Sequence, residues 1–215
     1  MEFYKTMAKD FSRTRYKIWP GVREFLESIP INSLILDAGC GNGKNMMETK
    51  HNFIGLDTCS EFLDIIQTKI WSKNLTNIQD LILGSVEKLP FESNTFDALI
   101  SIAVIHHIQT RQKRFEAFKE LIRVVKPGGS LLITVWQLES NPTYTDGLVV
   151  PNGLDPNDRL IKWSVQGSYL YRFYHFYTLK EIQDLIQDLI NFSQDKIKNI
   201  QLSDEKLNYY IKIQL

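Results

Sequence analysis

The chain has 215 residues, of which 43% are hydrophobic and 12% aromatic, so it is long enough to bury a sizeable core in one domain. Its 25 basic and 25 acidic residues give a formal charge of zero, which excludes a strong overall attraction to nucleic acid or membrane; any polyanion would have to meet a local patch. No stretch approaches the roughly 18 consecutive apolar residues of a membrane span, and the N-terminal stretch has no apolar signal core. We therefore expect a soluble intracellular protein.

Short apolar runs alternate with helical patterns through the first two thirds of the chain. Ser60 is expected to cap a helix that runs to about Ile70, and Thr110 to cap one that stops at Lys126. Strands that alternate with helices predict a parallel sheet in an α/β fold. The apolar runs place buried strands at 34–36, 53–56, 80–83, 96–102 and 130–136.

The C-terminal part of the chain, from Thr178 onward, begins with a helix signal. Thr178 and Glu181 form a capping-box pattern, and apolar residues at helical spacing follow it. Residues 197–202 and 207–215 predict two closing strands, joined as a hairpin. The stretch from about 137 to 177 reads as irregular and is rich in aromatic residues, so we expect a folded, substrate-facing insertion within a single domain, 1–215.

A glycine-rich loop follows the first predicted strand. Gly39, Gly41 and Gly43 have G-x-G-x-G spacing, whereas the dinucleotide fingerprint is G-x-G-x-x-G. With Asp37 ahead of it, the loop resembles the first motif of class I methyltransferases, which use S-adenosyl-L-methionine and release S-adenosylhomocysteine. The resemblance implies that Asp37 meets the ammonium group of the cofactor and Asp57 its ribose hydroxyls. Taken alone, the glycines also fit a tight turn, and Asp57 a helix cap.

Later motifs extend this resemblance to nearly the whole chain. They imply a Rossmann-like fold with a seven-stranded, mostly parallel sheet and helices on both faces. Ser85 stands where many members of the superfamily have an Asp that contacts adenine, and Val86 and Ile102 complete the implied cofactor set. The segments that resemble the fourth-strand and fifth-strand motifs are 89–91, 94–101 and 124–133.

Three separate segments outside the cofactor motifs resemble the eukaryotic tRNA wobble-uridine methyltransferases: Phe11–Pro20, Ser101–Ile108 and Arg172–Phe176. The resemblance implies methyl transfer to the carboxylate of 5-carboxymethyluridine in the tRNA anticodon loop. It also implies a small zinc-binding activator subunit at the sheet edge near the third strand. Residues 78–83 fit that edge, and they fit equally well an edge strand shielded within a monomer.

The implied substrate needs positioning more than a base, because a carboxylate with a pKa of about 4 is already ionised at neutral pH. Arg15 and Arg172 are the expected carboxylate clamps, and His106 or His107, after the fourth strand, is expected to hydrogen-bond the substrate. Instead of binding substrate, the N-terminal basic residues could form a solvated charge cluster, and the tryptophans could belong to the core. The other expected substrate residues, mostly stacking faces, are Tyr16, Lys17, Trp19, Trp136, Tyr174 and His175.

Local basic residues could still form a tRNA surface. We expect the protein in the cytoplasm and also in the nucleus. Three rival functions remain open: a methyltransferase of a quinone, lipid or carboxylic acid; a nicotinamide oxidoreductase; and a non-catalytic subunit, suggested by Ser85 and by Asn152 in place of an aromatic. We expect Cys40 and Cys59 to be reduced, and no metal site. The basic residues in question are 13, 15, 17, 23, 111, 113, 114, 159, 162 and 172.

Overall fold

The computed structural model describes residues 7–8, 11–47, 49–139, 148–150, 155–165, 168–193 and 196–215. The helices are α2 (Pro20–Ser28), α3 (Ser60–Lys73), η1 (Ile105–His107), α4 (Arg111–Val124) and α6 (Leu179–Ser193). The strands are β1 (Leu34–Ala38), β2 (Asn52–Asp57), β3 (Ile78–Leu83), β4 (Phe96–Ile102), β5 (Val125–Trp136), β6 (Leu148–Val149), β7 (Asp158–Val165), β8 (Ser168–His175), β9 (Asn199–Glu205) and β10 (Asn208–Gln214).

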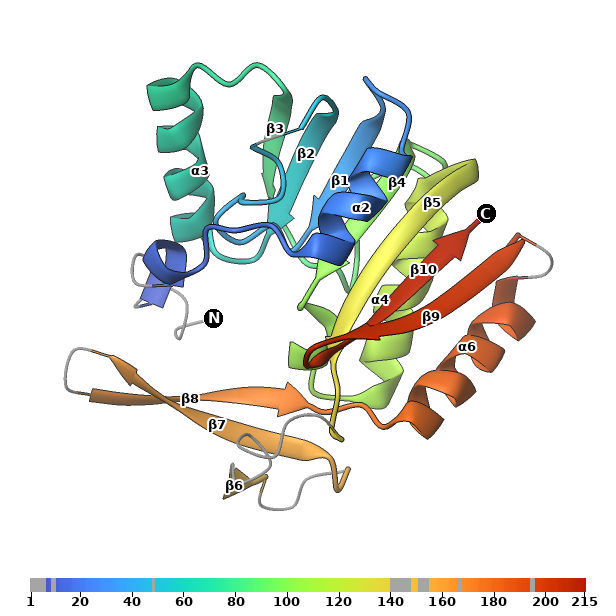
Figure 1. Ribbon diagram of the computed structural model, residues 1–215. Helices are drawn as coiled ribbons and strands as arrows, with labels where there is room; N and C mark the ends of the chain where they lie inside the picture. The colour runs from blue at the N-terminus through green and yellow to red at the C-terminus, as the bar shows by residue number, and fades with distance from the viewer. Residues whose placement is uncertain are drawn as a thin grey trace.

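The main sheet has seven strands in the order β3-β2-β1-β4-β5-β10-β9 (Figure 1). The first five pair in parallel, and β10 pairs antiparallel with both β5 and β9. The predicted Rossmann-like class, its five parallel strands and its closing hairpin are therefore confirmed. β2 and β3 are added on one side of β1, whereas β4 and β5 are added on the other. At such a switch point the carboxyl ends of β1 and β4 leave a crevice of the kind where open α/β sheets bind ligands.

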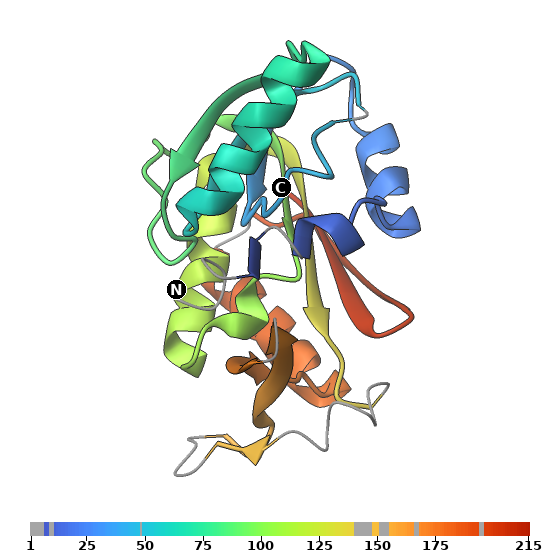
Figure 2. The same ribbon diagram turned by 90° about the vertical axis from the view of Figure 1, so that its left-hand side faces the viewer.

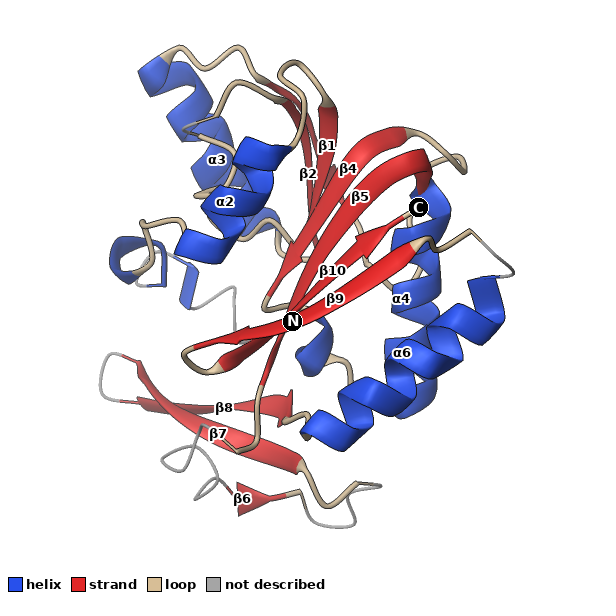
Figure 3. Ribbon diagram, turned by 45° about the vertical axis from the view of Figure 1, so that its right-hand side comes forward, coloured by secondary structure: helices blue, strands red, loops and turns tan. Residues whose placement is uncertain are grey.

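Helices cover both faces of this sheet (Figure 3). On one face, Phe25 of α2 and Ile66 of α3 pack with strand residues such as Ile35 and Ile100. On the other, α4 and α6 pack against the alternate strand residues, Leu36 and Leu99 among them. Alternate side chains of a strand point to opposite faces, so β1 and β4 are buried on both sides. No described helix is long and apolar enough to cross a membrane.

The helix starts agree with two of the three sequence predictions. Thr110 caps α4, where its hydroxyl accepts a hydrogen bond from the Lys113 amide at 3.3 Å. The capping box of α6 forms between Thr178 and Glu181, at 2.9 and 3.2 Å. The prediction for Ser60 was wrong by one residue: Cys59 is the N-cap, because Asp57 already accepts from the Cys59 amide at 2.9 Å.

The stretch from about 137 to 177 contains more regular structure than its sequence indicates. A small antiparallel sheet, β6-β7-β8, lies below the carboxyl ends of the parallel strands in Figure 1. Its strands were missed although Ile161, Trp163 and Val165 alternate with Lys162 and Ser164, because Pro, Gly and Asn are frequent in the stretch around them. This hairpin forms the outer wall of the cavity described next.

Candidate active site

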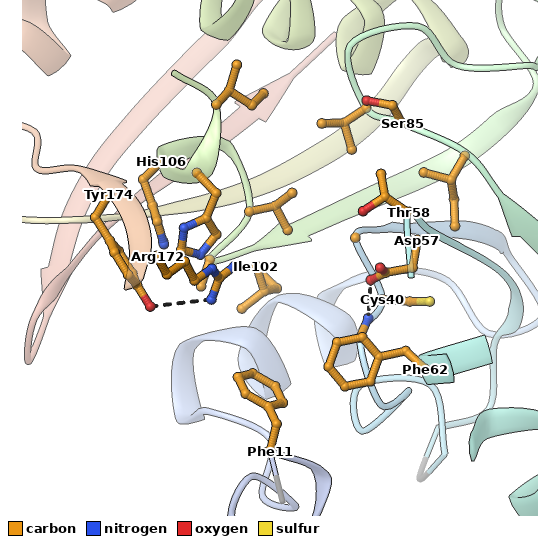
Figure 4. Close-up of a pocket in the computed structure, with 18 of the residues that line it drawn as sticks. Phe11, Cys40, Asp57, Thr58, Phe62, Ser85, Ile102, His106, Arg172 and Tyr174 are labelled. Carbon is orange, nitrogen blue, oxygen red and sulfur yellow. Dashed lines mark hydrogen bonds between the residues drawn. The ribbon is translucent and has the colours of Figure 1, made fainter. Parts of the chain in front are cut away.

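A cavity of about 470 Å³ lies between the carboxyl ends of the parallel strands and the β7-β8 hairpin. Figure 4 shows its two sides: Asp57, Cys40 and Phe62 on one, and His106, Arg172 and Tyr174 on the other. The first side comes from β1, β2 and the loops that follow them. The second comes from η1 and β8. We call these the cofactor half and the substrate half, according to the sequence predictions.

The glycine loop wraps tightly over the end of β2. The amides of Gly39 and Cys40 both donate to the Leu56 carbonyl, at 2.7 and 2.9 Å. Gly39 has a φ of +88°, and a Cβ there would lie 2.3 Å from Val104 Cγ2, so only glycine fits. A Cβ on Gly41 would instead meet nothing within 4 Å. Because Gly41 lines the cavity, that open space is where a ligand can approach the backbone.

Asp37 lies buried beneath this loop rather than on the cavity lining. Neither of its carboxylate oxygens accepts a hydrogen bond from the described residues. Burial raises the pKa of Asp37 to about 7; the Asn45 amide and Lys44 oppose this rise and the Asp57 charge adds to it. A buried carboxylate without a partner is costly, and a ligand cation would relieve that cost. The arrangement fits the ammonium group of an amino-acid ligand.

Asp57 has two tasks at the end of β2. Its Oδ2 accepts from the Gly41 amide at 2.8 Å and its Oδ1 from the Cys59 amide at 2.9 Å. Each carboxylate oxygen has a second lone pair, and Asp57 lines the cavity, so it can also accept from a ribose hydroxyl. Burial raises its pKa, while these backbone hydrogen bonds lower it. Asp57 therefore orders the glycine loop and the start of α3 through backbone amides, and it can still face a ligand in the cavity.

The remaining predicted cofactor residues divide into two groups. Ser85, Val86 and Ile102 line the cavity, and the Ser85 hydroxyl accepts from the Glu87 amide at 3.2 Å. Gly43 does not line it. Its φ of +74° and the Ile66 side chain, 2.8 Å from where its Cβ would be, give Gly43 a role in the turn instead.

The substrate half is dominated by His106, which is fully buried. Its Nδ1 lies 3.4 Å from the Trp136 amide, which can only donate, so the proton of the neutral ring is on Nε2. Burial holds the pKa of His106 well below its usual range, with the charges of His107 and His175 acting in the same direction. Its Nε2 has no hydrogen-bond partner among the described residues. His106 therefore presents an unsatisfied N–H donor.

His107 has the opposite tautomer. Its Nδ1 lies 3.0 Å from the Phe173 carbonyl and must donate to it, which ties η1 to β8. Burial lowers the pKa of His107 to about 3, so this ring is neutral as well. Both histidines line the cavity, but only His106 has a buried ring nitrogen left without a partner.

Aromatic rings and two arginines complete the substrate half. Tyr174 stacks on Trp136, with ring centroids 4.7 Å apart and an interplanar angle of 25°. Arg172 donates to the Tyr174 hydroxyl at 3.3 Å, and burial lowers the pKa of Arg172 to about 10. The guanidinium carbon of Arg15 lies 4.3 Å from the Phe11 ring centroid. Both arginines line the cavity and lie against aromatic faces, Arg15 over Phe11 and Arg172 over Tyr174.

Three predicted substrate residues lie elsewhere. Tyr16 is 69% exposed and Lys17 lies 5.9 Å from its ring centroid, outside this cavity. His175 is buried and faces away from it, because alternate residues of β8 point to opposite sides and Tyr174 takes the inner one. The His175 ring nitrogens lie 2.8 Å from Asp158 Oδ1 and 3.3 Å from Glu181 Oε1. These contacts fasten the β7-β8 hairpin to α6. Trp19 does line the cavity.

Sequence reasoning missed four residues of the site. Phe11, Phe62 and Trp163 line the cavity, and Phe11 meets Phe62 edge to face with ring centroids 5.4 Å apart. Asn42 donates to the Arg15 carbonyl at 2.8 Å and so holds the N-terminal segment over the glycine loop. Phe11 lies in the segment Phe11–Pro20 and Trp163 in the insertion, but the spacing of neither residue connects it to the cofactor loop.

Two further features bear on the predicted chemistry. Cys40 and Cys59 are buried and free. Within the described residues, Asp155, Asp158 and His175 have ligand atoms within 4.8 Å of one another, a spacing compatible with a metal ion. Arg114 lies 3.9 Å from Asp155, so a cation already faces this group. Asn152, where the sequence departs from the family pattern, lies outside the described residues.

Comparisons with known proteins agree with this geometry. A family profile described as a methyltransferase domain matches residues 36–133. A curated relative from Schizosaccharomyces pombe, named tRNA (carboxymethyluridine(34)-5-O)-methyltransferase, is 30% identical over 86% of this chain and 85% of its own length. One of the same name from Arabidopsis thaliana is 44% identical over 65% of this chain. A solved SAM-dependent methyltransferase from Methanosarcina mazei has a TM-score of 0.69 at 19% identity, covering 92% of this chain and 98% of that one.

The relatives differ greatly in length. The alignment covers only 33% of the Arabidopsis relative, so this chain spans about a third of that protein. In the fission yeast relative, by contrast, it spans most of the length.

Proposed function

Because the chain belongs to the family of class I S-adenosylmethionine-dependent methyltransferases that includes the tRNA (carboxymethyluridine(34)-5-O)-methyltransferases, we propose that it forms the methyl ester of 5-carboxymethyluridine at the tRNA wobble position. Its cofactor is S-adenosyl-L-methionine, and S-adenosylhomocysteine is the product. The acceptor is the carboxylate oxygen of the modified uridine, and the tRNA anticodon loop is the partner that carries it.

One observation carries the proposal: two buried polar groups of opposite kind lack a hydrogen-bond partner among the described residues. The Asp37 carboxylate, beneath the glycine loop of the cofactor half, lacks a donor, and the His106 Nε2–H of the substrate half lacks an acceptor. A cofactor with an ammonium group satisfies the first, and a substrate carboxylate or uracil carbonyl satisfies the second. Methyl transfer between these two ligands would bring both to the same cavity.

The charges of the two halves suit the reaction. The bound cofactor supplies an electrophilic methyl group on a positively charged sulfur. The attacking carboxylate is already ionised, so none of the neutral histidines has to remove a proton. Arg15 and Arg172 can hold the carboxylate while one of its oxygens forms the new C–O bond, and the C–S bond breaks. Charge balances, because an anion and a sulfonium give a neutral ester and a thioether.

The uracil ring has a matching surface. Tyr174, Trp136 and His106 form a stack along the cavity wall. A base lifted from a single-stranded loop can stack against such aromatic faces, and stacking alone does not distinguish one pyrimidine from another. The neutral His106 then recognises the substrate by donating a hydrogen bond and not by carrying a charge.

A small zinc-binding activator subunit is proposed to cover the β3 edge. β3 is the edge strand of the main sheet, so one side of its backbone is free to pair with another strand. Leu83 at its end is 63% exposed, and Trp71 of the neighbouring α3 is 76% exposed. Apolar side chains beside an open edge favour strand addition by a partner. With tRNA as substrate, we propose the cytoplasm, and also the nucleus, as its location.

The test is methylation of purified tRNA that carries 5-carboxymethyluridine, with labelled cofactor and with the activator present. Nucleoside analysis should find the methyl ester at the wobble position, and mild alkali should release the label as methanol. A free carboxymethyl nucleoside or a small carboxylic acid replaces the tRNA in parallel reactions. Turnover of the small acids without turnover of tRNA would overturn the proposal in favour of a small-molecule methyltransferase.

A further inference from the structure

A second hollow lies on the surface beside the catalytic cavity, along α3 and the loop that follows β1. Figure 2 shows this loop running between α3 and α2. Among the described residues that line it, none carries a carboxylate. We call it the basic hollow, after its four cationic side chains: Arg13, Lys44, Lys69 and Lys73.

The lysines of the basic hollow carry charge that nearby groups do not fully balance. The Lys69 ammonium donates to the Asn42 carbonyl at 2.8 Å, a neutral partner. Burial lowers the pKa of Lys69, and the charge of Lys73 lowers it further. Burial also lowers the pKa of Lys44, where Arg15 acts in the same direction and Asp37 opposes it. Lysines that repel one another, in a hollow whose described lining has no carboxylate, attract an anion.

The basic hollow adjoins the catalytic cavity. Lys44 lines both, and its ammonium lies 4.8 Å from the Trp19 ring centroid. Arg15, on the cavity side, is separated along the chain from Arg13 and Tyr16, on the hollow side, by one residue at most. A strand that places one nucleotide in the cavity would therefore pass its neighbours over these lysines.

Tyr16 gives the basic hollow an aromatic wall. This side chain is 69% exposed and lines the basic hollow, so its ring is accessible beside the lysines. Single-stranded nucleic acids bind to surfaces that combine cations for the phosphates with aromatic faces for the bases. Tyr16 and the lysines supply both components beside the cavity.

We propose that the basic hollow binds the phosphate groups of the RNA strand next to the nucleotide held in the cavity, with Tyr16 stacking on an adjoining base. This inference rests on the proposed function, and it assigns the tRNA-binding surface to residues that the sequence did not single out, apart from Arg13 and Tyr16. It also explains how a chain of zero net charge can bind a polyanion, because phosphate contacts require only local charge.

The test compares two double variants that remove the same charge. Lys69→Gln with Lys73→Gln empties the basic hollow of two cations, while Lys119→Gln with Lys180→Gln removes two from α4 and α6 on the other face of the sheet. Binding of labelled tRNA is measured by fluorescence anisotropy across salt concentrations, with S-adenosylhomocysteine present. Methyl transfer is measured separately.

The hollow variant should lose about tenfold in tRNA affinity, and the slope of log affinity against log salt should fall in magnitude by about 1.4, or 0.7 for each single-strand phosphate contact. Affinity for S-adenosylhomocysteine and kcat at saturating tRNA should stay within about twofold. The control variant should keep the wild-type slope. Because Lys69 also contacts the glycine loop, Lys73→Gln alone is measured as well, with half the slope change expected.

An unchanged slope in the hollow variant would overturn the inference. If the wild type methylates tRNA in that case, the proposed function stands and another surface binds the backbone. If the wild type binds tRNA with the predicted slope but transfers no methyl group, the proposed function fails while the basic hollow remains a nucleic-acid site. If the wild type binds no tRNA at all, the inference fails.

Discussion

The two halves of the cavity are built in different ways. The cofactor half comes mostly from one short stretch of chain, residues 37–57, and its polar groups include the Asp57 carboxylate, Lys44, Asn45 and loop backbone. The substrate half draws on the N-terminal segment, η1, β5 and the β7-β8 hairpin, and its polar groups include arginines and neutral histidines. The first half thus depends on local sequence and the second on segments far apart in the chain, so one fold can keep its cofactor loop while the acceptor site differs.

The sharpest way to test this division is to remove a donor from the substrate half. Arg172→Gln should lower kcat/KM for tRNA by about 100-fold or more, because losing the proposed contact between this buried charge and the carboxylate costs about 3 kcal/mol. S-adenosylhomocysteine affinity, measured by calorimetry, should change less than about twofold. Lys180→Gln, on α6, whose exposed ammonium pairs with Asp184 at 3.0 Å, is the control and should keep wild-type kcat/KM. Equal losses of both quantities would show that the halves are not separate.

The matching change in the cofactor half is Asp37→Asn. It should weaken S-adenosylhomocysteine binding by about 30-fold, since the ammonium group loses its only charged partner beneath the loop. It should also stabilise the protein without ligand at pH 8. The pKa of Asp37 is about 7 when folded against 3.8 in the reference state, so burying the ionised form costs about 4 kcal/mol at most.

The sign of that stability effect can be checked by pH. Because folding raises the pKa of Asp37, its contribution to stability is greatest below pH 3.8, is lost as the pH rises from 3.8 to about 7, and is constant above. The difference in melting temperature between Asp37→Asn and wild type should therefore grow through this window and then level off. A variant that is less stable than wild type at pH 8 would contradict the account of Asp37 as a strained, unpaired carboxylate.

Cofactor affinity itself should depend on pH in the wild type. The proposed contact pairs the ammonium group with the ionised form of Asp37, so lowering the pH from 8 to 6 should weaken S-adenosylhomocysteine binding by about tenfold. Asp37→Asn should remove most of this dependence. A wild-type affinity that stays flat over this range would mean that another group balances the charge of the ligand.

The smallest expected effect concerns adenine. Ser85→Ala should weaken cofactor binding by only about threefold, because one hydroxyl contact to a neutral group contributes about 0.5–1.5 kcal/mol. Val86→Thr, which keeps the side-chain shape next door, serves as the comparison. A loss as large as that of Asp37→Asn would place Ser85 among the main cofactor contacts.

How much of this could be predicted from sequence differs between the halves. Asp37, Gly39 and Gly41 could be found because a strand leads straight into them and their spacing is local. Trp163 could not be found in the same way, because its distance from His106 is set by how the β7-β8 hairpin folds back over the sheet. The error at Ser60 has a local origin instead: the Cys59 amide donates to Asp57 two residues earlier, and the helix begins directly after Cys59.

The sequence by itself determined the alternation of strands and helices and the glycine loop. It also determined the two carboxylates at the ends of β1 and β2. Periodicity and turn chemistry act over a few residues, so these features can be identified locally. Only the tertiary structure decided which side of β8 faces the cavity, so that Tyr174 enters it and His175 instead fastens the hairpin to Asp158 and Glu181. The same is true of the tautomers of His106 and His107, which depend on single backbone groups far along the chain. Burial and hydrogen bonding, not spacing, set the chemistry of these side chains.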